Sequence, residues 1–226
     1  MKIIYSWSGG KDSCLALYKT IIAEHNIFFL LNFISEEYKR CCFHGISTEL
    51  MKLQSDAIGI PIIQKEVPAD MEKYETEFKS AVIEIKNRYK IDGMGFGDIY
   101  LQEHKSWVER VCNEIGIIPI EPLWNINPVD VIKEFINFGF KAKIVSAKAD
   151  LFPEDFLGKD IDYKLLEYLL MRKVCPCGEN GEFHTFVYDG PIFKKCINLI
   201  ETEKILKDNY WKHWFLDIKK FELIDK

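Results

Sequence analysis

The sequence predicts an α/β fold in which a Rossmann-like parallel sheet has helices on both faces and a small β-rich C-terminal subdomain follows. Short apolar runs alternate with segments of helical periodicity up to about residue 150. Such alternation is typical of parallel strands joined by crossover helices. Beyond that point the rhythm ends, and aromatic, β-rich sequence follows. We therefore expect an α/β domain over residues 1–150 and a C-terminal subdomain over residues 151–226.

Strands are predicted where apolar residues run almost without interruption, because the strands of a covered parallel sheet are buried on both faces. These runs are KIIYSW (2–7), NIFFLLNFI (26–34), PIIQKEV (61–67), IDGMGF (91–96), GIIPIEPLW (116–124) and KAKIVSA (141–147). Helices are predicted where apolar residues recur every three or four positions, as they do from Cys14 to Ile21. Similar stripes lie at 46–57, 74–89, 108–115 and 161–172. Asn127 followed by Pro128 indicates the start of a further helix that ends near Gly139.

The composition restricts the class of protein. The chain has 226 residues, 48% of them hydrophobic, and a net charge of −5. A net acidic chain is unlike proteins that coat nucleic-acid phosphates, so nucleic acid is not an expected partner. No apolar stretch approaches the roughly 20 residues of a membrane span, and the N-terminus lacks the layout of a signal peptide. Seven cysteines, an odd number, favour free thiols, and we expect a cytoplasmic protein.

The stretch YSWSGGKDS connects the first predicted strand to the first predicted helix. Glycines in such a turn let backbone N–H groups face an anion, and the helix start adds unsatisfied donors and a positive dipole end. The loop is not a Walker A motif, because Asp12 stands where that motif has Ser or Thr after the lysine. An ordinary strand-to-helix turn is the alternative. The candidate phosphate-binding residues are Ser8, Gly9, Gly10, Lys11, Asp12 and Ser13.

A second stretch, CGENGEFHTFVYDGPIF at 177–193, is dense in functional groups. Gly178 and Gly181 bracket Glu179 and Asn180, which suggests a backbone that approaches a ligand closely. If the following run is a strand, Glu182 and His184 project from one face. A carboxylate beside an imidazole is suited to proton transfer or to holding an amine. A polar hairpin with a hydrogen-bonded histidine is the alternative.

The SGGKDS stretch resembles the signature of the N-type ATP pyrophosphatase superfamily, the PP-loop enzymes. That resemblance implies the adenine nucleotide alpha hydrolase-like fold and a loop that grips the β,γ-pyrophosphate of ATP while the α-phosphorus is attacked. Together with GENGEFHT and DGPIF, the SGGKDS stretch resembles the diphthine–ammonia ligase family. This resemblance covers residues 1–200. Members of the family convert diphthine, a modified histidine on elongation factor 2, to diphthamide with ATP and ammonia, by analogy through an acyl adenylate.

The resemblance makes residues 1–150 the ATP-binding unit and 151–226 the substrate side. We expect catalytic roles for Lys11, which neutralises charge on the departing pyrophosphate, and for Glu182 and His184, which hold ammonium and accept its proton. We expect Asp12 to hold Mg²⁺ that arrives with ATP. Adenine is expected against backbone near Phe33, Gly95 and Gly97. The residues expected to contact the acceptor substrate are His44, Asp98, Glu179 and Asn180.

Several alternatives remain at this point. The chain could be a PP-loop enzyme that modifies tRNA or a nucleotide, such as a thiolase, or a regulatory module that binds ATP or AMP without catalysis. Cys175 and Cys177 could hold zinc or carry sulfur, although a zinc site usually needs four ligands. His44 could be a capping or partly buried histidine. The aromatic tail NYWKHWFLDIKKFELI at 209–224 needs burial, and we expect a homodimer.

Overall fold

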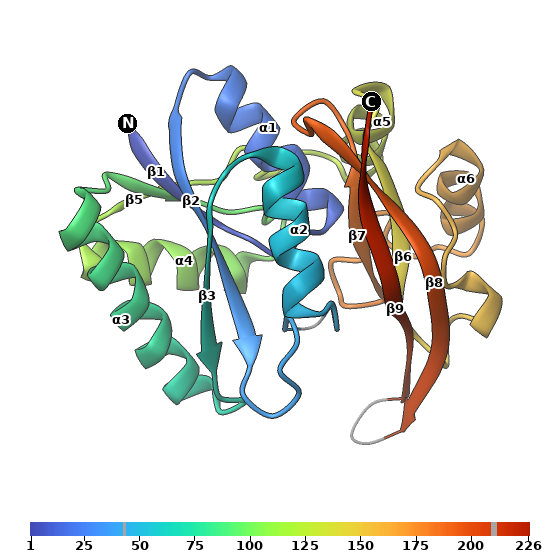
Figure 1. Cartoon of the computed structure of the whole chain (residues 1–226). Helices are drawn as coiled ribbons and strands as arrows, with labels where there is room; N and C mark the ends of the chain where they lie inside the picture. Colours follow the sequence, from blue (N-terminus) through green and yellow to red (C-terminus); the bar gives the residue numbers. More distant parts are fainter. Residues whose placement is uncertain (43, 209–211) are drawn as a thin grey trace.

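Two β-sheets lie side by side in the computed structural model, which describes residues 1–42, 44–208 and 212–226 (Figure 1). The first sheet has the order β3-β2-β1-β4-β5 and its neighbouring strands are parallel, as the sequence predicts. Its strands are β1 (Lys2–Ser6), β2 (Asn26–Ser35), β3 (Ile62–Val67), β4 (Gly93–Gly95) and β5 (Ile118–Ile120). The predicted α/β fold class is confirmed.

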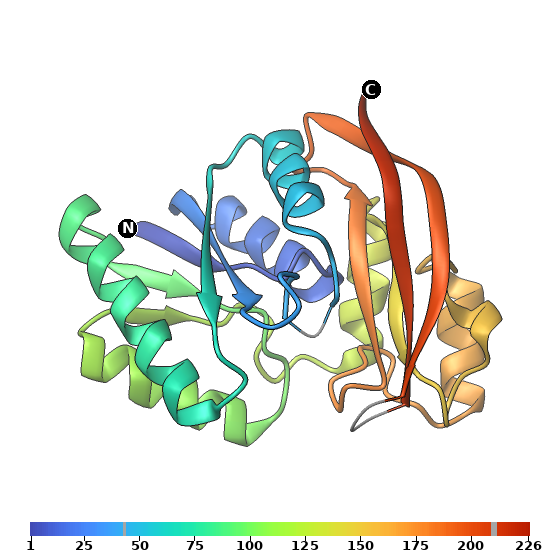
Figure 2. The same ribbon diagram turned by 60° about the horizontal axis from the view of Figure 1, so that its bottom comes forward.

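Helices cover both faces of this parallel sheet. Helices α3 (Met71–Tyr89) and α4 (Gln102–Ile115) pack on the face that carries Ile4 and Leu31. Helices α1 (Lys11–Ile22), α2 (Thr48–Ile58) and α5 (Pro128–Asn137) lie on the other side, between the two sheets (Figures 1 and 2). The predicted start of α5 is confirmed, because the N–H of Val129 donates to the Asn127 side chain over 2.9 Å.

The second sheet is antiparallel and has the order β7-β6-β9-β8. Its strands are β6 (Lys141–Lys148), β7 (Phe183–Asp189), β8 (Lys195–Asp208) and β9 (Lys212–Asp225). A short 3₁₀ helix (Glu154–Phe156) and helix α6 (Tyr163–Met171) cover its outer side (Figure 1). Among the described helices, none is long and apolar enough to cross a membrane.

One predicted strand belongs to a different sheet from the one expected. The run at 141–147 was expected to continue the parallel sheet, and that prediction is wrong. In the structure β6 pairs antiparallel with β7, with Ala142 opposite Val187 and Ala147 opposite Phe183. A buried strand has the same apolar pattern in a parallel and in an antiparallel sheet, and the strands that pair with β6 come much later in the chain. The apolar residues of β6 therefore predict a strand but not the strands with which it pairs.

The described part of the aromatic tail lies in β9, which pairs with β8. Trp214 and Phe221 are partly buried and pack against the main core of their own chain. Tyr210 and Trp211, which also led to the expectation of a homodimer, lie outside the described residues. The homodimer stays a prediction.

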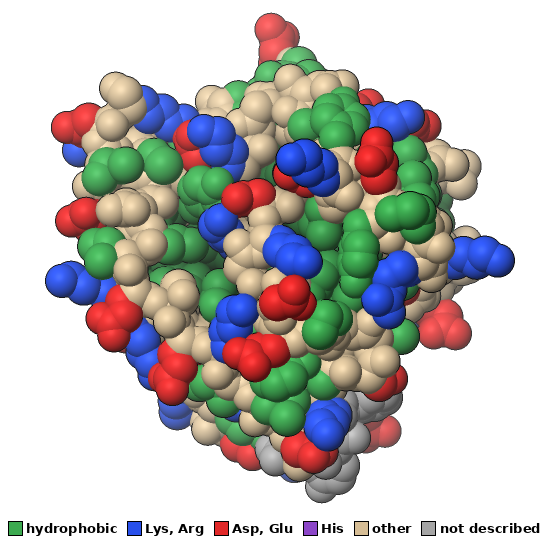
Figure 3. All heavy atoms as spheres, turned by 90° about the vertical axis from the view of Figure 1, so that its right-hand side faces the viewer, with side chains coloured by type: hydrophobic (Ala, Val, Ile, Leu, Met, Phe, Trp, Pro, Cys, Tyr) green, Lys and Arg blue, Asp and Glu red, His purple; other side chains and the backbone are tan. Residues whose placement is uncertain are grey.

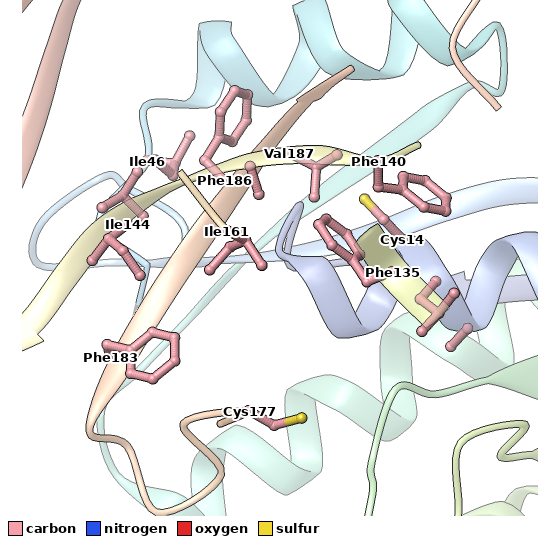
Figure 4. Close-up of a cluster of buried hydrophobic side chains, with 14 of the residues drawn as sticks. Cys14, Ile46, Phe135, Phe140, Ile144, Ile161, Cys177, Phe183, Phe186 and Val187 are labelled. Carbon is pink, nitrogen blue, oxygen red and sulfur yellow. The ribbon is translucent and has the colours of Figure 1, made fainter. Parts of the chain in front are cut away.

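The core between the sheets brings the glycine-rich loop against β7. Figure 4 shows Cys14 of α1 near Phe135 of α5, with Phe186 and Val187 of β7 and Ile144 of β6 beside them. Removing these side chains from water supplies most of the attraction between the two halves. Apolar contact of this kind is not directional, so hydrogen bonds must set the position of one half of the chain relative to the other.

Gln54 of α2 supplies such hydrogen bonds, and its side chain is fully buried. Its Nε2 donates to the carbonyl oxygens of Gly9 at 3.0 Å and Val187 at 2.7 Å. Its Oε1 accepts a hydrogen bond of 3.0 Å from the indole of Trp7. The N–H of Val187 also donates to Gly9 O over 3.0 Å. One amide therefore joins the loop, α2 and β7.

We expect Gln54→Leu to lower the free energy of unfolding by about 3 kcal/mol, because the Trp7 indole and the Val187 carbonyl lose their partner inside the core. Urea unfolding followed by circular dichroism measures this. Gln64→Leu is the matched control, since Gln64 is half-buried and donates two longer hydrogen bonds, of 3.3 and 3.2 Å. Equal losses in the two variants would contradict the role given to Gln54.

Candidate functional site

A cavity of about 610 Å³ lies at the carboxyl edge of the parallel sheet, where the loops after β1, β2 and β4 meet the segment before β7. Open α/β sheets place their ligands at this edge. Its lining includes ten of the residues that the sequence singled out: Ser8, Lys11, Asp12, Ser13, Phe33, His44, Gly97, Asp98, Glu179 and Asn180. His184 also lines it. The structure thus brings both sequence motifs to one cavity.

The loop at 8–13 is compact and closely surrounded. Ser8 Oγ lies 3.1 Å from Ser13 Oγ, and the Ser13 hydroxyl donates to Gly10 O over 3.1 Å. A Cβ on Gly10 would lie 2.6 Å from Cε1 of His44. Gly9 has a φ of +73°, a conformation that glycine adopts without strain. Glycine is required here because helix α2, His44 and β7 lie too close to the loop to leave room for a side chain.

Lys11 is the charged centre of the cavity, and only 3% of it is exposed. Its Nζ donates to Asp12 Oδ2 over 2.7 Å and to the carbonyl oxygen of Cys177. Burial is the largest single effect and acts to lower the pKa of Lys11, but the charges of Asp12, Cys177 and Glu179 and the hydrogen bond to Asp12 together raise it. The lysine therefore keeps its positive charge inside the cavity, at the N-terminal end of α1, where the helix dipole also favours an anion.

Acidic side chains gather on one side of Lys11. Burial raises the pKa of Asp12 despite the attraction of Lys11, and the buried Oδ1 of Asp12 has no hydrogen-bond partner among the described residues. Burial, with the charges of Asp12 and Asp98, raises the pKa of Glu179 to about 7. Asp98 Oδ1 lies 3.0 Å from His104 Nδ1, and this hydrogen bond raises the pKa of His104. This acidic side is suited to a cation.

Two imidazoles line the opposite side. The rings of His44 and His184 are 4.7 Å apart between centroids, and His44 Nδ1 lies 2.9 Å from the carbonyl oxygen of Thr185. Burial lowers the pKa of His44 to about 4 and lowers that of His184 well below its usual value. Both rings are therefore neutral at neutral pH, and His184 is a weaker base than an exposed histidine.

Glu182 does not line the cavity as the sequence led us to expect. Its carboxylate accepts hydrogen bonds from the backbone N–H and the Nδ2 of Asn180, at 2.9 and 3.0 Å. The preceding Gly181 has a φ of +71°, so the chain turns before β7 begins at Phe183. His184 lines the cavity, whereas Glu182 is not among the lining residues and its carboxylate holds Asn180.

The glycines expected near adenine have different environments. Gly97 lines the cavity, and a Cβ there would lie 3.0 Å from backbone atoms of Asp12 and Ser13. Gly95 lies inside β4, where a Cβ would come within 2.0 Å of the Tyr5 ring. The packing of Tyr5 therefore accounts for glycine at position 95, and Gly95 is not among the residues that line the cavity.

Sequence reasoning missed several residues of the cavity. Asn32 is buried in β2 and donates to Trp7 O over 2.9 Å, and His104 of α4 pairs with Asp98. An asparagine inside the apolar run at 26–34 was the available signal for the first. No pattern pointed to His104. Tyr100 does not line the cavity, but its hydroxyl lies 3.4 Å from Nδ2 of the lining residue Asn180.

No group of three or more His, Cys, Asp or Glu side chains among the described residues is arranged to hold a metal ion. Cys175 accepts a hydrogen bond from Tyr100, and the Cys177 thiol lies 3.4 Å from Pro128 O. All seven cysteines are free thiols. The residues present fit a Mg²⁺ ion that is bound by one protein carboxylate and by the phosphates of a nucleotide, which is its usual arrangement. The unpartnered Oδ1 of Asp12 is suited to that place.

Comparison with known proteins agrees with this geometry. The sequence profile of the diphthamide synthase N-terminal domain matches residues 1–119, and that of the diphthamide synthase C-terminal domain matches residues 127–224. The chain belongs to the diphthamide synthase family. The first profile ends within β5, the last strand of the parallel sheet, and the second begins just before α5, which leads to the antiparallel sheet.

Relatives of this family extend over most of the chain. A zebrafish (Danio rerio) diphthine–ammonia ligase is 28% identical over 100% of this chain and 98% of its own length. The human (Homo sapiens) diphthine–ammonia ligase is 28% identical over 91% of this chain and 85% of its own length. A solved structure from Methanocaldococcus jannaschii, described as a "predicted subunit of tRNA methyltransferase", aligns with a TM-score of 0.48 at 17% identity, over 83% of this chain and 96% of that one.

The neutral imidazoles predict a pH dependence of stability. Because the pKa of His44 is lowered to about 4, the unfolded chain takes up a proton below about pH 6.5 that the folded chain refuses. The free energy of unfolding should therefore fall as the pH falls from 6.5 towards 4, and His44→Gln should fall less steeply. Urea unfolding at pH 7, 6 and 5 measures this. His25→Gln, in the turn after α1, is the control and should keep the wild-type slope.

Proposed function

We propose that the protein is an ATP-dependent amide ligase that activates a carboxylate as an acyl adenylate and transfers the acyl group to ammonia. The observation that supports it most is the single cavity shared by the loop at 8–13 and the segment 177–185. A buried lysine at a helix N-terminus suits the departing pyrophosphate, and the second segment faces it directly. The names of the relatives agree with this assignment.

In the proposed reaction, a carboxylate oxygen of the acceptor attacks the α-phosphorus of ATP. The bond from the α-phosphorus to the oxygen bridging to the β-phosphorus breaks, and pyrophosphate leaves with that oxygen. Lys11 and the N-terminal end of α1 offset the negative charge that develops there. Ammonia then attacks the acyl carbon, the bond from that carbon to the AMP oxygen breaks, and the nitrogen gives up one proton as the amide forms.

Ammonia reaches this site mostly as ammonium, so a group must bind the cation and accept a proton. The acidic side of the cavity provides both functions in the proposal. Asp98 and Glu179 attract the cation, and Glu179, whose pKa is about 7, can be a carboxylate that accepts a proton near neutral pH. We therefore assign to Glu179 the proton transfer first expected of Glu182 and His184. Glu182 acts as a positioning residue for Asn180.

The acceptor that we propose is diphthine on elongation factor 2, where the host makes diphthamide, and the compartment that we propose is the cytoplasm. Of the two alternatives, a tRNA-modifying enzyme would need a basic surface for RNA phosphates. On the face that carries α6, basic and acidic side chains are interspersed (Figure 3). A regulatory module would have no use for a buried lysine placed to offset the charge of pyrophosphate.

Release of AMP and pyrophosphate from Mg²⁺-ATP, dependent on ammonium and on elongation factor 2 in its diphthine form, tests the proposal directly. We expect Lys11→Ala to lower the rate at least a hundredfold, because the charge on the leaving group loses its partner. Lys19→Ala, on the same helix but paired with Glu134, should keep the wild-type rate. Full activity of the Lys11 variant would refute the role of the loop.

The role of Glu179 gives a separate prediction. Because its pKa is raised to about 7, the amidation rate should rise with pH through that value as the carboxylate loses its proton. In Glu179→Gln we expect the KM for ammonium to rise about tenfold and this limb of the pH profile to disappear. The affinity for ATP, measured by calorimetry, should change little. Glu167→Gln, exposed on α6, is the control, and an unchanged pH profile in Glu179→Gln would contradict the assignment.

A further inference from the structure

The side-chain amide of Asn180 is held in one orientation at the edge of the cavity. Asn180 lines the cavity, whereas Glu182 and Tyr100, which contact its amide nitrogen, do not belong to the described lining. Nδ2 of Asn180 donates to Glu182 Oε1 over 3.0 Å and lies 3.4 Å from the Tyr100 hydroxyl oxygen. That hydroxyl donates to Cys175 Sγ over 3.3 Å, so its oxygen can accept from Nδ2. Both hydrogens of Nδ2 therefore have acceptors outside the described lining.

The remaining polar atoms of Asn180 leave only its side-chain oxygen for a ligand. Its backbone N–H donates to Glu182 Oε2, and its carbonyl oxygen accepts from Lys148 Nζ, each over 2.9 Å. Within the described part of the chain, Oδ1 is the one polar atom of Asn180 without a hydrogen bond. If the amide turned over, Oδ1 would face the Glu182 carboxylate with no hydrogen between them. Glu182 is buried, so water gives little relief from that repulsion, and the amide keeps its orientation.

This orientation adds a third acceptor to the acidic side of the cavity. Asp98, Glu179 and Asn180 all line the cavity, and each has a side-chain oxygen that accepts hydrogen bonds. Ammonia has three N–H bonds and one lone pair, so three acceptors can hold its hydrogens while the lone pair attacks. Water has two O–H bonds and leaves one of the three acceptors unpaired. A site built from hydrogen-bonding groups rejects a ligand that leaves one of them without a partner.

We propose that Asn180 binds the ammonium nitrogen through Oδ1 and favours it over water as the nucleophile, with Glu182 and Tyr100 as positioning residues. This inference rests on the proposed function, in which a nitrogen nucleophile attacks an acyl adenylate. An amide that turned over would at times present N–H groups to the ammonium ion and repel it. Because Glu182 and Tyr100 hold the two hydrogens of Nδ2, the amide acts only as an acceptor towards the cavity.

The choice between ammonia and water is measured by the AMP released for each amide formed. When water attacks the acyl carbon, the bond to the AMP oxygen breaks and the carboxylate returns, so ATP is consumed without an amide. With elongation factor 2 in its diphthine form, we expect Asn180→Ala to raise the KM for ammonium about fivefold. Below that KM, the ratio of hydrolysis to amidation should rise by a similar factor. The KM for ATP should not change.

Asn198→Ala is the matched control. Asn198 is also an exposed asparagine that donates to a glutamate, Glu222, over 3.1 Å, but it lies on β8 outside the described lining of the cavity. It should keep the wild-type KM and the wild-type ratio. The proposal is overturned if the two asparagine variants behave alike, or if Asn180→Ala raises the KM for elongation factor 2 and not that for ammonium.

A double-mutant cycle tests whether Glu182 acts through Asn180. Glu182→Gln keeps the shape of the side chain, but its new N–H₂ group can donate to Oδ1 and so lets the amide turn over. We expect it to raise the KM for ammonium about as much as Asn180→Ala does, and the double variant to raise it no further. Tyr100→Phe, which removes the longer contact, should raise it about twofold. Additive effects of Glu182→Gln and Asn180→Ala would contradict the positioning role.

Nuclear Overhauser effects test the orientation of the amide without turnover. We expect them between the Nδ2 hydrogens of Asn180 and the ring hydrogens of Tyr100, in the wild type and in Asn198→Ala, and we expect Glu182→Gln to weaken them. Their absence from the wild type, or equal strength in Glu182→Gln, would overturn the fixed orientation. If the wild-type chain forms no amide, the proposed function fails instead, and these effects still decide whether the amide is fixed.

Discussion

The structure around the cavity depends on the burial of one positive charge. Lys11 has lost almost all contact with water, and a buried ammonium group is costly unless carboxylate or carbonyl oxygens surround it. One partner, Asp12, comes from its own helix. The other, the carbonyl of Cys177, comes from the segment that leads to β7. Both halves of the chain therefore supply the oxygen atoms that compensate the burial of this charge.

This requirement explains why so many contacts converge on the loop. Gln54, Val187 and Thr185 all bond to its backbone, the last through a 3.0 Å hydrogen bond from the N–H of Lys11 to the Thr185 hydroxyl. The glycines at 9 and 10 leave space for helix α2, His44 and β7. A loop held in this way is preorganised, and little of the binding energy of a nucleotide is lost in ordering it. The same contacts place residues 177–185 beside the loop at 8–13.

The sequence predicted the local elements and the first motif because both depend on neighbouring residues. Buried runs and helical stripes predicted the parallel sheet, and SGGKDS predicted the turn between the first strand and the first helix. What failed depended on distant partners. The pairing of β6 is decided by β7 and β9, and the glycine at 95 by the ring of Tyr5. Glu182 was expected at the ligand, but its carboxylate binds the backbone and side chain of Asn180, a contact that strand alternation does not reveal.

The net charge of the chain does not predict the charges inside the cavity. The chain as a whole is acidic, with a net charge of −5, and this argues against a nucleic-acid partner. It says nothing of the cavity, where a few buried groups decide the field because water cannot screen them. There Lys11, the acids Asp98 and Glu179 and the neutral histidines line one cavity. Groups of opposite charge so close together let one small space attract both an anion and a cation, which a field of a single sign would not do.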